Sequence, residues 1–385
     1  MSSVYPVCVH ELVRIRCVQP GTIMTTSAEV AKTRLVLFLG SGFSRALGLP
    51  TTETLSRDLL TNPEGSVDKP LEEFISARIR EFWQAVFGWR EGTRDPTLED
   101  HFTQIDMAAN AGHNLGATYS PKKLRAIRRL TIHRIFSLLK SKGVRSERIL
   151  RLFKRMNEKF EITIVTTNWD WEAERCLDML NISHNDGVDV ITLTGWRPPG
   201  KEVPILKLHG SVNRGYCDCC RMLVSFGEQL VESVVNLKLL LEPGDFRLFG
   251  EAELADRLDR SRRWRTCTCC GGSIGMRVAT FSYRKDMNPH AFQAIWGRAE
   301  TDLQLAGNWL FVGYSLPEAD IKIRHSLKSA QLARRDSQRV SIDVVLKEDC
   351  ESGKRYKRFF GLADNLVFQD GIDEWIDRNL EDCCA

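Results

Sequence analysis

The chain has 385 residues, of which 43% are hydrophobic and 27% charged, a composition that excludes collagen, general disorder and a small disulfide-stapled scaffold. Its 54 basic and 50 acidic residues leave a net charge of +4, which gives no reason to expect a general nucleic-acid binder. No apolar run approaches the roughly 20 residues that cross a bilayer. We therefore expect a soluble globular protein, built as one large domain with insertions or as two domains.

The N-terminal segment does not look like a cleavable signal. Charged and polar residues, among them His10, Glu11 and Arg14, interrupt any apolar core there. We expect residues 1–30 to be an extension, either native or, up to Met24, an artefact of the reading frame. Without a signal peptide, a cytoplasmic location is expected.

The first predicted strand is the continuous apolar run Leu35–Leu39, which is typical of a strand covered on both faces. A helix is predicted near 51–60, and residues 70–158 are predicted to be almost wholly helical, because apolar residues recur there at three- and four-residue spacing. Further strands are predicted at 162–165, 188–193, 205–208, 309–312 and 341–346, with helices ending near 180 and at 289–306 and 319–334. This alternation predicts an α/β fold with a Rossmann-like, doubly wound parallel sheet.

Two insertions interrupt the alternation. One is helical, at about 66–158, and the other carries the clustered cysteines, at 215–276. The sheet domain would then comprise residues 31–214 and 277–385.

Six of the 12 cysteines form two clusters, Cys217-Asp218-Cys219-Cys220 and Cys267-Thr268-Cys269-Cys270. Paired C-x-x-C knuckles in a long chain are typical of tetrahedral zinc, and a four-sulfur site is structural. We expect Cys217, Cys220, Cys267 and Cys270 to be the ligands, although Cys219 or Cys269 could replace a neighbour. The long spacing between the pairs requires a looped-out helix near 227–241.

Four turns of small or polar residues follow predicted strands. They are Gly40-Ser41-Gly42-Phe43-Ser44, Thr166-Thr167-Asn168-Trp169-Asp170, Lys207-Leu208-His209-Gly210-Ser211 and Gly313-Tyr314-Ser315-Leu316-Pro317. Each has an ordinary reading as a tight turn or a helix cap. Together they would meet in one crevice, because ligands of open α/β sheets bind at the carboxyl ends of the strands. The set therefore predicts a site for a nucleotide-type ligand, with one asparagine and one histidine near the reacting bond.

These turns together resemble the sirtuin (SIR2) family. Gly40-Ser41-Gly42-Phe43-Ser44 and Gly48-Leu49-Pro50 are similar to the sirtuin opening, and Thr166–Asp170 resembles its T-Q-N-x-D segment. His209-Gly210 matches the catalytic H-G pair, and the paired cysteines match the zinc module. Two features depart from protein-deacetylating members: Thr51-Thr52-Glu53 replaces Asp-Phe-Arg, and Thr167 replaces glutamine. The turn ending in Asp320 and the helical insertion are similar to the bacterial antiphage-defence branch, whose members hydrolyse NAD.

The resemblance implies cleavage of the nicotinamide–ribose bond of NAD by water. Asn168 would hold ribose hydroxyls or water, His209 would be the general base, and Asp170 would orient Asn168 or cap its helix. The dinucleotide would be bound by Gly40, Ser41, Gly42, Ser44, Thr167, Gly313, Tyr314, Ser315 and Asp320. One structural zinc is expected.

Two alternatives remain at this point: an NAD-dependent protein-lysine deacylase, and a subunit that senses NAD or ADP-ribose without turnover. The resemblance also implies a homo-oligomer, or a partner such as a HerA-type ATPase or an Argonaute. No membrane partner is expected, and nucleic acid only indirectly.

Overall fold

Seven parallel strands form the main sheet of the computed structural model. They are β1 (Thr33–Leu39), β2 (Phe160–Thr166), β3 (His184–Asn185), β6 (Val203–Lys207), β10 (Asn308–Val312), β11 (Ser341–Val345) and β12 (Val367–Phe368). Their order is β12-β11-β10-β1-β2-β6-β3, so the chain winds outward from β1 in both directions. The predicted doubly wound sheet is confirmed.

The structure describes residues 32–62, 66, 68–139, 143–192, 195–226, 240–260, 266–283, 290–334, 340–363 and 366–380. From Thr33 onward, the chain forms a single unit. Three predicted segments lie wholly or partly outside the described residues. They are the N-terminal extension, most of the looped-out helix near 227–241 and the end of the strand predicted at 188–193.

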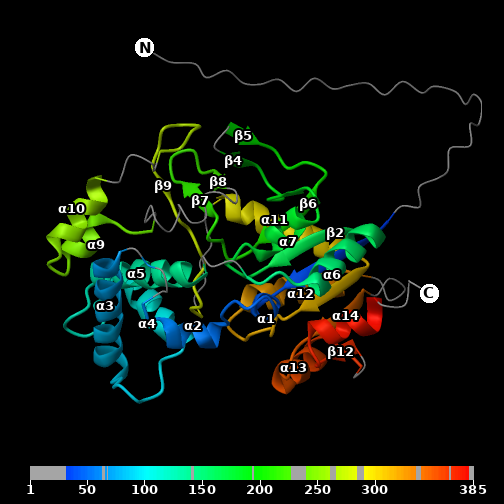
Figure 1. The fold of residues 1–385 in the computed structure, drawn as a ribbon, viewed down its shortest axis with the longest axis horizontal. Helices are drawn as coiled ribbons and strands as arrows, with labels where there is room; N and C mark the ends of the chain where they lie inside the picture. The colour runs from blue at the N-terminus through cyan, green and yellow to red at the C-terminus, as the bar shows by residue number, and fades with distance from the viewer. Residues whose placement is uncertain are drawn as a thin grey trace, which may run out of the picture. The chain divides into compact units, whose positions relative to one another are not determined.

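Helices cover both faces of the sheet (Figure 1). They are α6 (Glu147–Lys159), α7 (Glu172–Met179), α11 (His290–Leu305), α12 (Ile321–Leu332), α13 (Cys350–Phe360) and α14 (Ile372–Leu380). Alternate side chains of β1 point to opposite faces: Val36 and Phe38 pack with α11, α12 and α13, whereas Leu35 and Leu37 pack in the core that includes residues of α6, α7 and α14. Burial on both faces explains why β1 is apolar at every position from Leu35 to Leu39.

Three helices of the predicted insertion at about 66–158 form a group of their own: α3 (Lys69–Phe87), α4 (Leu98–Ala111) and α5 (Pro121–Leu139). The last helix of that range, α6, packs on the sheet instead. Two short helices from the cysteine-bearing insertion, α9 (Pro243–Arg247) and α10 (Ala252–Arg260), pack against the group of α3, α4 and α5 (Figure 1). Arg129 Nε donates to Asp245 Oδ2 at 2.9 Å, and the rings of Phe74 and Phe246 are 5.3 Å apart. The two insertions therefore share one hydrophobic core, which their separation in the sequence did not indicate.

A second sheet of five short strands carries the cysteines. Its order is β5-β4-β8-β7-β9, formed by β4 (Val190–Thr192), β5 (Gly195–Arg197), β7 (Arg214–Cys217), β8 (Leu223–Ser225) and β9 (Ile274–Gly275). Because β4 and β5 precede residue 215, this small sheet draws on more of the chain than the predicted 215–276 segment. In the described part of the chain, every helix is too short or too polar to pass through a lipid bilayer.

Candidate active site

A cavity of about 680 Å³ opens where the carboxyl ends of β1, β2, β6 and β10 converge. The connections from β1 lead first to β2 on one side and later to β10 on the other, which makes this the switch point of the sheet, where ligands of open α/β proteins bind. Residues from all four turns singled out in the sequence line it: Ser41, Gly42, Ser44, Thr167, Asn168, Asp170, His209, Gly313, Tyr314, Ser315 and Asp320. The turns thus meet as their positions at strand ends predict.

Glycine allows the turns after β1 and β10 to touch, backbone to backbone. A Cβ on Gly40 would lie 2.4 Å from Tyr314 Cα, and one on Gly42 would lie 2.7 Å from Gly313 Cα. Gly40 N donates to Val312 O at 3.0 Å, and Gly42 N donates to Gly313 O at 2.9 Å. Gly313 itself has φ +64°, a conformation that favours glycine. These glycines therefore join two strand ends, and a phosphate contact by Gly40 or Gly42 stays a prediction.

The Asn168 carboxamide is held in one orientation. Its Nδ2 donates to Gly40 O at 2.8 Å and to Ser44 Oγ at 2.8 Å. A carbonyl oxygen only accepts, so the nitrogen must face Gly40. The turn itself is fixed by Thr166, whose hydroxyl accepts from Asn168 N at 3.0 Å and donates to Leu39 O. No described residue donates to Asn168 Oδ1, which leaves this oxygen as an acceptor at the cavity wall.

Asp170 completes a hydrogen-bonded chain behind Asn168. Ser44 Oγ accepts from Asn168 and donates to Asp170 Oδ2 at 2.7 Å, while Asp170 Oδ1 accepts from Glu172 N at 3.1 Å in the first turn of α7. Asp170 therefore holds Asn168 through Ser44 and also accepts a hydrogen bond from the start of α7. Burial raises the pKa of Asp170, and the nearby Lys207 ammonium and the Ser44 hydroxyl oppose this rise.

Lys207 links the ends of β2 and β6 below the cavity. Its buried ammonium donates to Asp170 O and to Ser211 Oγ, the latter at 2.8 Å, and pairs with Glu174 Oε1 at 2.9 Å. Burial lowers the pKa of Lys207, and the carboxylate of Glu174 counteracts this effect. Its hydrogen bond to Asp170 O therefore holds the asparagine turn against the histidine turn.

His209 lies two residues after β6, on the wall of the same cavity as Asn168. Its side chain is largely buried, and its carbonyl accepts from Ala279 N at 3.0 Å. Gly210, at φ +81°, lets the chain turn here, since a Cβ would lie 2.6 Å from Arg277 O. The imidazole is thus placed at the edge of a water-accessible cavity with its backbone anchored.

Asp320 supports the turn after β10 from behind. The Tyr314 hydroxyl donates to Asp320 Oδ2 at 2.7 Å, and the Tyr356 hydroxyl donates to Tyr314 O at 2.9 Å. Burial and the neighbouring Asp320 carboxylate hold the pKa of Tyr314 well above its usual value. Within this turn, Asp320 therefore positions Tyr314.

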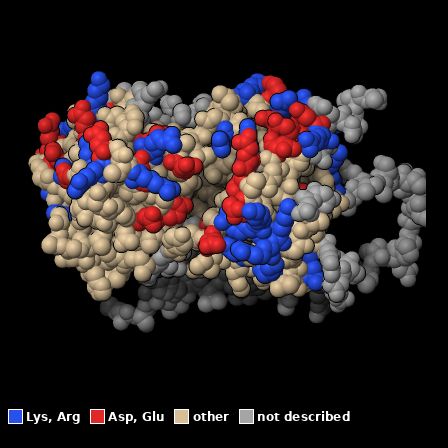
Figure 2. Space-filling model, turned by 90° about the horizontal axis from the view of Figure 1, so that it is seen from below, with Lys and Arg blue, Asp and Glu red and all other residues tan. Residues whose placement is uncertain are grey.

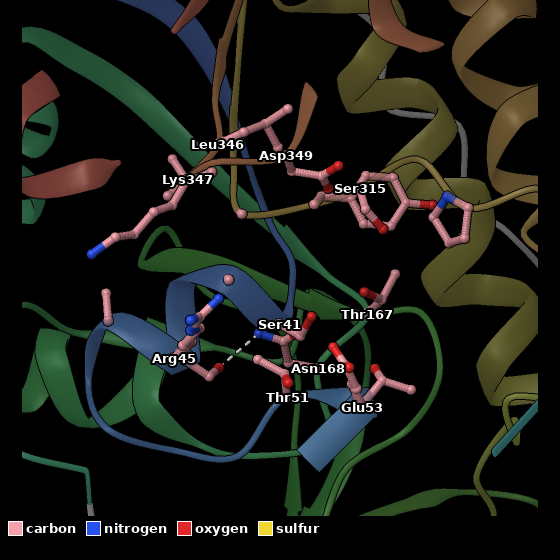
Figure 3. Close-up of a pocket in the computed structure, with 18 of the residues that line it drawn as sticks. Ser41, Arg45, Thr51, Glu53, Thr167, Asn168, Ser315, Leu346, Lys347 and Asp349 are labelled. Carbon is pink, nitrogen blue, oxygen red and sulfur yellow. Dashed lines mark hydrogen bonds between the residues drawn. The ribbon is translucent and has the colours of Figure 1, made fainter. Parts of the chain in front are cut away.

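Part of the cavity wall comes from residues that the sequence reasoning did not select. They are Arg45, Thr51, Glu53, Glu99, Phe281, Leu346–Asp349 and Gly371–Glu374, among others. Figure 3 shows Arg45 and Lys347 on one side of the cavity, and Thr167 and Ser315 on the other. Leu346 ends a predicted strand and Lys347–Asp349 directly follow it, so the strand-end rule could have identified them. Glu99 and Phe281 come from or beside the insertions, and no local signal marks them.

The cysteines form a separate cluster in the small sheet. The Sγ atoms of Cys217, Cys220, Cys267 and Cys270 all lie within 4.8 Å of one another. Two of the separations are 3.5 Å (Cys217–Cys270) and 3.8 Å (Cys220–Cys267). Tetrahedral zinc with bonds of about 2.3 Å places its sulfurs about 3.8 Å apart, so the four thiols fit this ion. Cys219 and Cys269 are not among these four.

No family model matches the chain, and no curated protein matches it. Among solved structures, it is similar to a Sir2 homologue in complex with NAD, at 13% identity over 90% of this chain and 88% of that one, with a TM-score of 0.39. It is also similar to a Sir2–p53 peptide–NAD+ structure, at 13% identity over 91% of this chain and 93% of that one, with a TM-score of 0.38. A sirtuin from a study of substrate affinity matches at 13% identity with the same coverage and a TM-score of 0.37. Similarity at this level does not assign the chain to a family.

Proposed function

We propose that the protein hydrolyses NAD+ at the bond between nicotinamide and ribose, releasing nicotinamide and ADP-ribose. The observation that carries the proposal is the single cavity shared by the Asn168 carboxamide and the His209 imidazole, at the switch point of a doubly wound sheet. Its volume of about 680 Å³ is in the range of cofactor pockets. The motif resemblance supplies the identity of the ligand.

The chemistry needs few groups. Nicotinamide leaves with the bonding electron pair, C1′ of the ribose develops oxocarbenium character, and water adds to it. Asn168 Oδ1 accepts from a ribose hydroxyl or from the attacking water, and the Ser44–Asp170 chain prevents the carboxamide from turning. His209 takes the proton of the water as general base. The buried carboxylate of Asp170 adds negative potential behind the developing cation.

The cysteine cluster would hold zinc as a structural ion. A four-thiolate site leaves no open position for substrate or water. Its place in a separate small sheet agrees with a role in folding the small module.

The test is release of nicotinamide from NAD+ by purified protein. We expect Asn168→Ala and His209→Ala each to lower the rate by about 10²–10⁴-fold. His113→Ala and Asn114→Ala are matched controls, because both side chains are exposed in the turn after α4 and neither lines the cavity. Circular dichroism and thermal unfolding verify that the cavity variants remain folded. Turnover by either at the parental rate would remove that residue from the mechanism.

Adding an acetylated peptide separates the alternatives. Hydrolysis predicts nicotinamide release that does not depend on the peptide. A strict requirement for the peptide would replace hydrolysis by lysine deacylation. Binding of NAD+ without release, by a protein assembled with its partners, would indicate a sensing subunit instead. An antiphage role would be tested in cells by comparing NAD+ levels during infection with the parental gene and with His209→Ala.

A further inference from the structure

The cavity is strongly acidic for a site that would bind a dinucleotide. Among its lining residues, the carboxylates are Glu53, Glu99, Asp170, Asp320, Glu348, Asp349, Asp373 and Glu374. Figure 2 shows acidic side chains along a hollowed part of one face of the molecule, next to a group of Lys and Arg side chains. A diphosphate carries about two negative charges, so it needs a local source of positive charge to enter such a site.

Two of the backbone N–H groups of the glycine turn are already engaged and supply little of that charge. The N–H groups of Gly40 and Gly42 already donate to Val312 O and Gly313 O. Helix α1 (Ser41–Ala46) has only six residues, so its dipole is short. The Ser44 hydroxyl is also engaged, since it donates to Asp170.

Two cations remain among the cavity-lining residues, Arg45 in α1 and Lys347 after β11. Both are exposed, and neither forms an ion pair with any residue that the structure describes. They come from segments far apart in the sequence, yet they lie on the same side of the cavity (Figure 3). Arginine presents a planar fork suited to phosphate oxygens, and lysine adds a point charge.

We propose that Arg45 and Lys347 together bind the diphosphate of the ligand and set its orientation in the cavity. This assignment deepens the proposed function and rests on it for the identity of the ligand. It places the phosphates on the side of Arg45 and Lys347 and the labile ribose bond toward Asn168 and His209. Selectivity for a phosphorylated ligand then comes from two side chains more than from the glycine backbone.

The test measures binding of ADP and of adenosine by calorimetry, because neither ligand has the bond that the enzyme would cleave. We expect the parental protein to bind ADP at least about tenfold more tightly than adenosine. Arg45→Gln and Lys347→Gln should each weaken ADP binding about tenfold, the double variant should lose the preference for ADP, and Arg45→Lys should restore part of it. Adenosine affinity should not change in any variant.

Salt dependence is a second measure. ADP affinity of the parental protein should fall as ionic strength rises, and the double variant should show a shallower dependence. Arg57→Gln and Lys154→Gln are matched controls, since both residues are exposed and outside the cavity. Equal ADP affinity in the parental protein and the double variant, or no preference for ADP in the parental protein, would overturn the assignment. These binding measurements do not depend on nicotinamide release. A failure of the proposed hydrolysis would therefore be detected by its own assay and not by this one.

Discussion

Replacing Ser44 by alanine tests the hydrogen-bonded chain that holds Asn168. The Ser44 hydroxyl lies between Asn168 Nδ2, at 2.8 Å, and Asp170 Oδ2, at 2.7 Å, and the side chain is buried. The variant removes one neutral hydrogen bond, worth about 1 kcal/mol, and one to a buried carboxylate, worth about 1.5–3 kcal/mol. We therefore expect Ser44→Ala to lower the free energy of unfolding by about 2–4 kcal/mol at neutral pH.

The loss of stability in Ser44→Ala should depend on pH in a defined direction. Burial already raises the pKa of Asp170 above its unfolded value, so ionisation of this carboxyl opposes folding. The free energy of unfolding therefore falls as the pH rises through the pKa of Asp170 in the folded protein. Loss of the Ser44 donor raises this pKa further. The difference between parental protein and variant should therefore be largest above the folded pKa of Asp170 and should shrink as the carboxyl becomes protonated at lower pH.

The assay is urea unfolding followed by circular dichroism at several pH values. Ser137→Ala is the matched control, because Ser137 is also buried but its hydroxyl has no hydrogen-bond partner among the described residues. We expect Ser137→Ala to be neutral or slightly stabilising. If Ser44→Ala and Ser137→Ala had the same effect at every pH, the hydroxyl would not link Asn168 to Asp170 as described.

Three further predictions concern other parts of the molecule. Burial lowers the pKa of His101 to about 3, so the imidazole stays neutral in the fold. The free energy of unfolding should therefore fall by up to about 1.4 kcal/mol for each unit that the pH drops between 6.5 and 3. His101→Gln should remove this contribution in acid unfolding, and an unchanged dependence of the free energy of unfolding on pH would refute the prediction. Gly42→Ala should lower the melting temperature, because its Cβ would lie 2.7 Å from Gly313 Cα, whereas Gly297→Ala, in an open position of α11, should raise or maintain it. Metal analysis should find about one zinc per chain in the parental protein. Cys220→Ser should lose this zinc, and Cys219→Ser should retain it. Equal zinc content in the two variants would contradict the ligand set.

The sheet and its ligand-binding edge could be predicted because their signals are local. Leu35–Leu39 is apolar at every position, which is typical of a strand buried on both faces, and the structure buries each of these residues. The four turns follow strands directly, so the geometry of a parallel sheet brings Asn168 and His209 to the same edge. The spacing of the C-x-x-C pairs likewise identified four cysteines whose Sγ atoms gather in the fold. That Cys219 and Cys269 are the spare members of their triplets stays a prediction.

Other features depend on tertiary packing that no local pattern contains. The contact of α9 with α5 joins residues more than a hundred positions apart, as in the Arg129–Asp245 hydrogen bond. The engagement of the Gly40 and Gly42 N–H groups by the end of β10 and the turn after it depends on which strand lies next to β1. Helices α13 and α14 were not predicted, and the cavity wall at Gly371–Glu374 was missed with them.

The most direct measurement of the central claim is the mass of the product formed from NAD+ in heavy-oxygen water. Hydrolysis at the nicotinamide–ribose bond predicts ADP-ribose that carries one solvent oxygen, formed without any acylated peptide and lost in His209→Ala. Intact NAD+ after incubation with the assembled protein, or an acylated ADP-ribose formed only with a peptide, would contradict it.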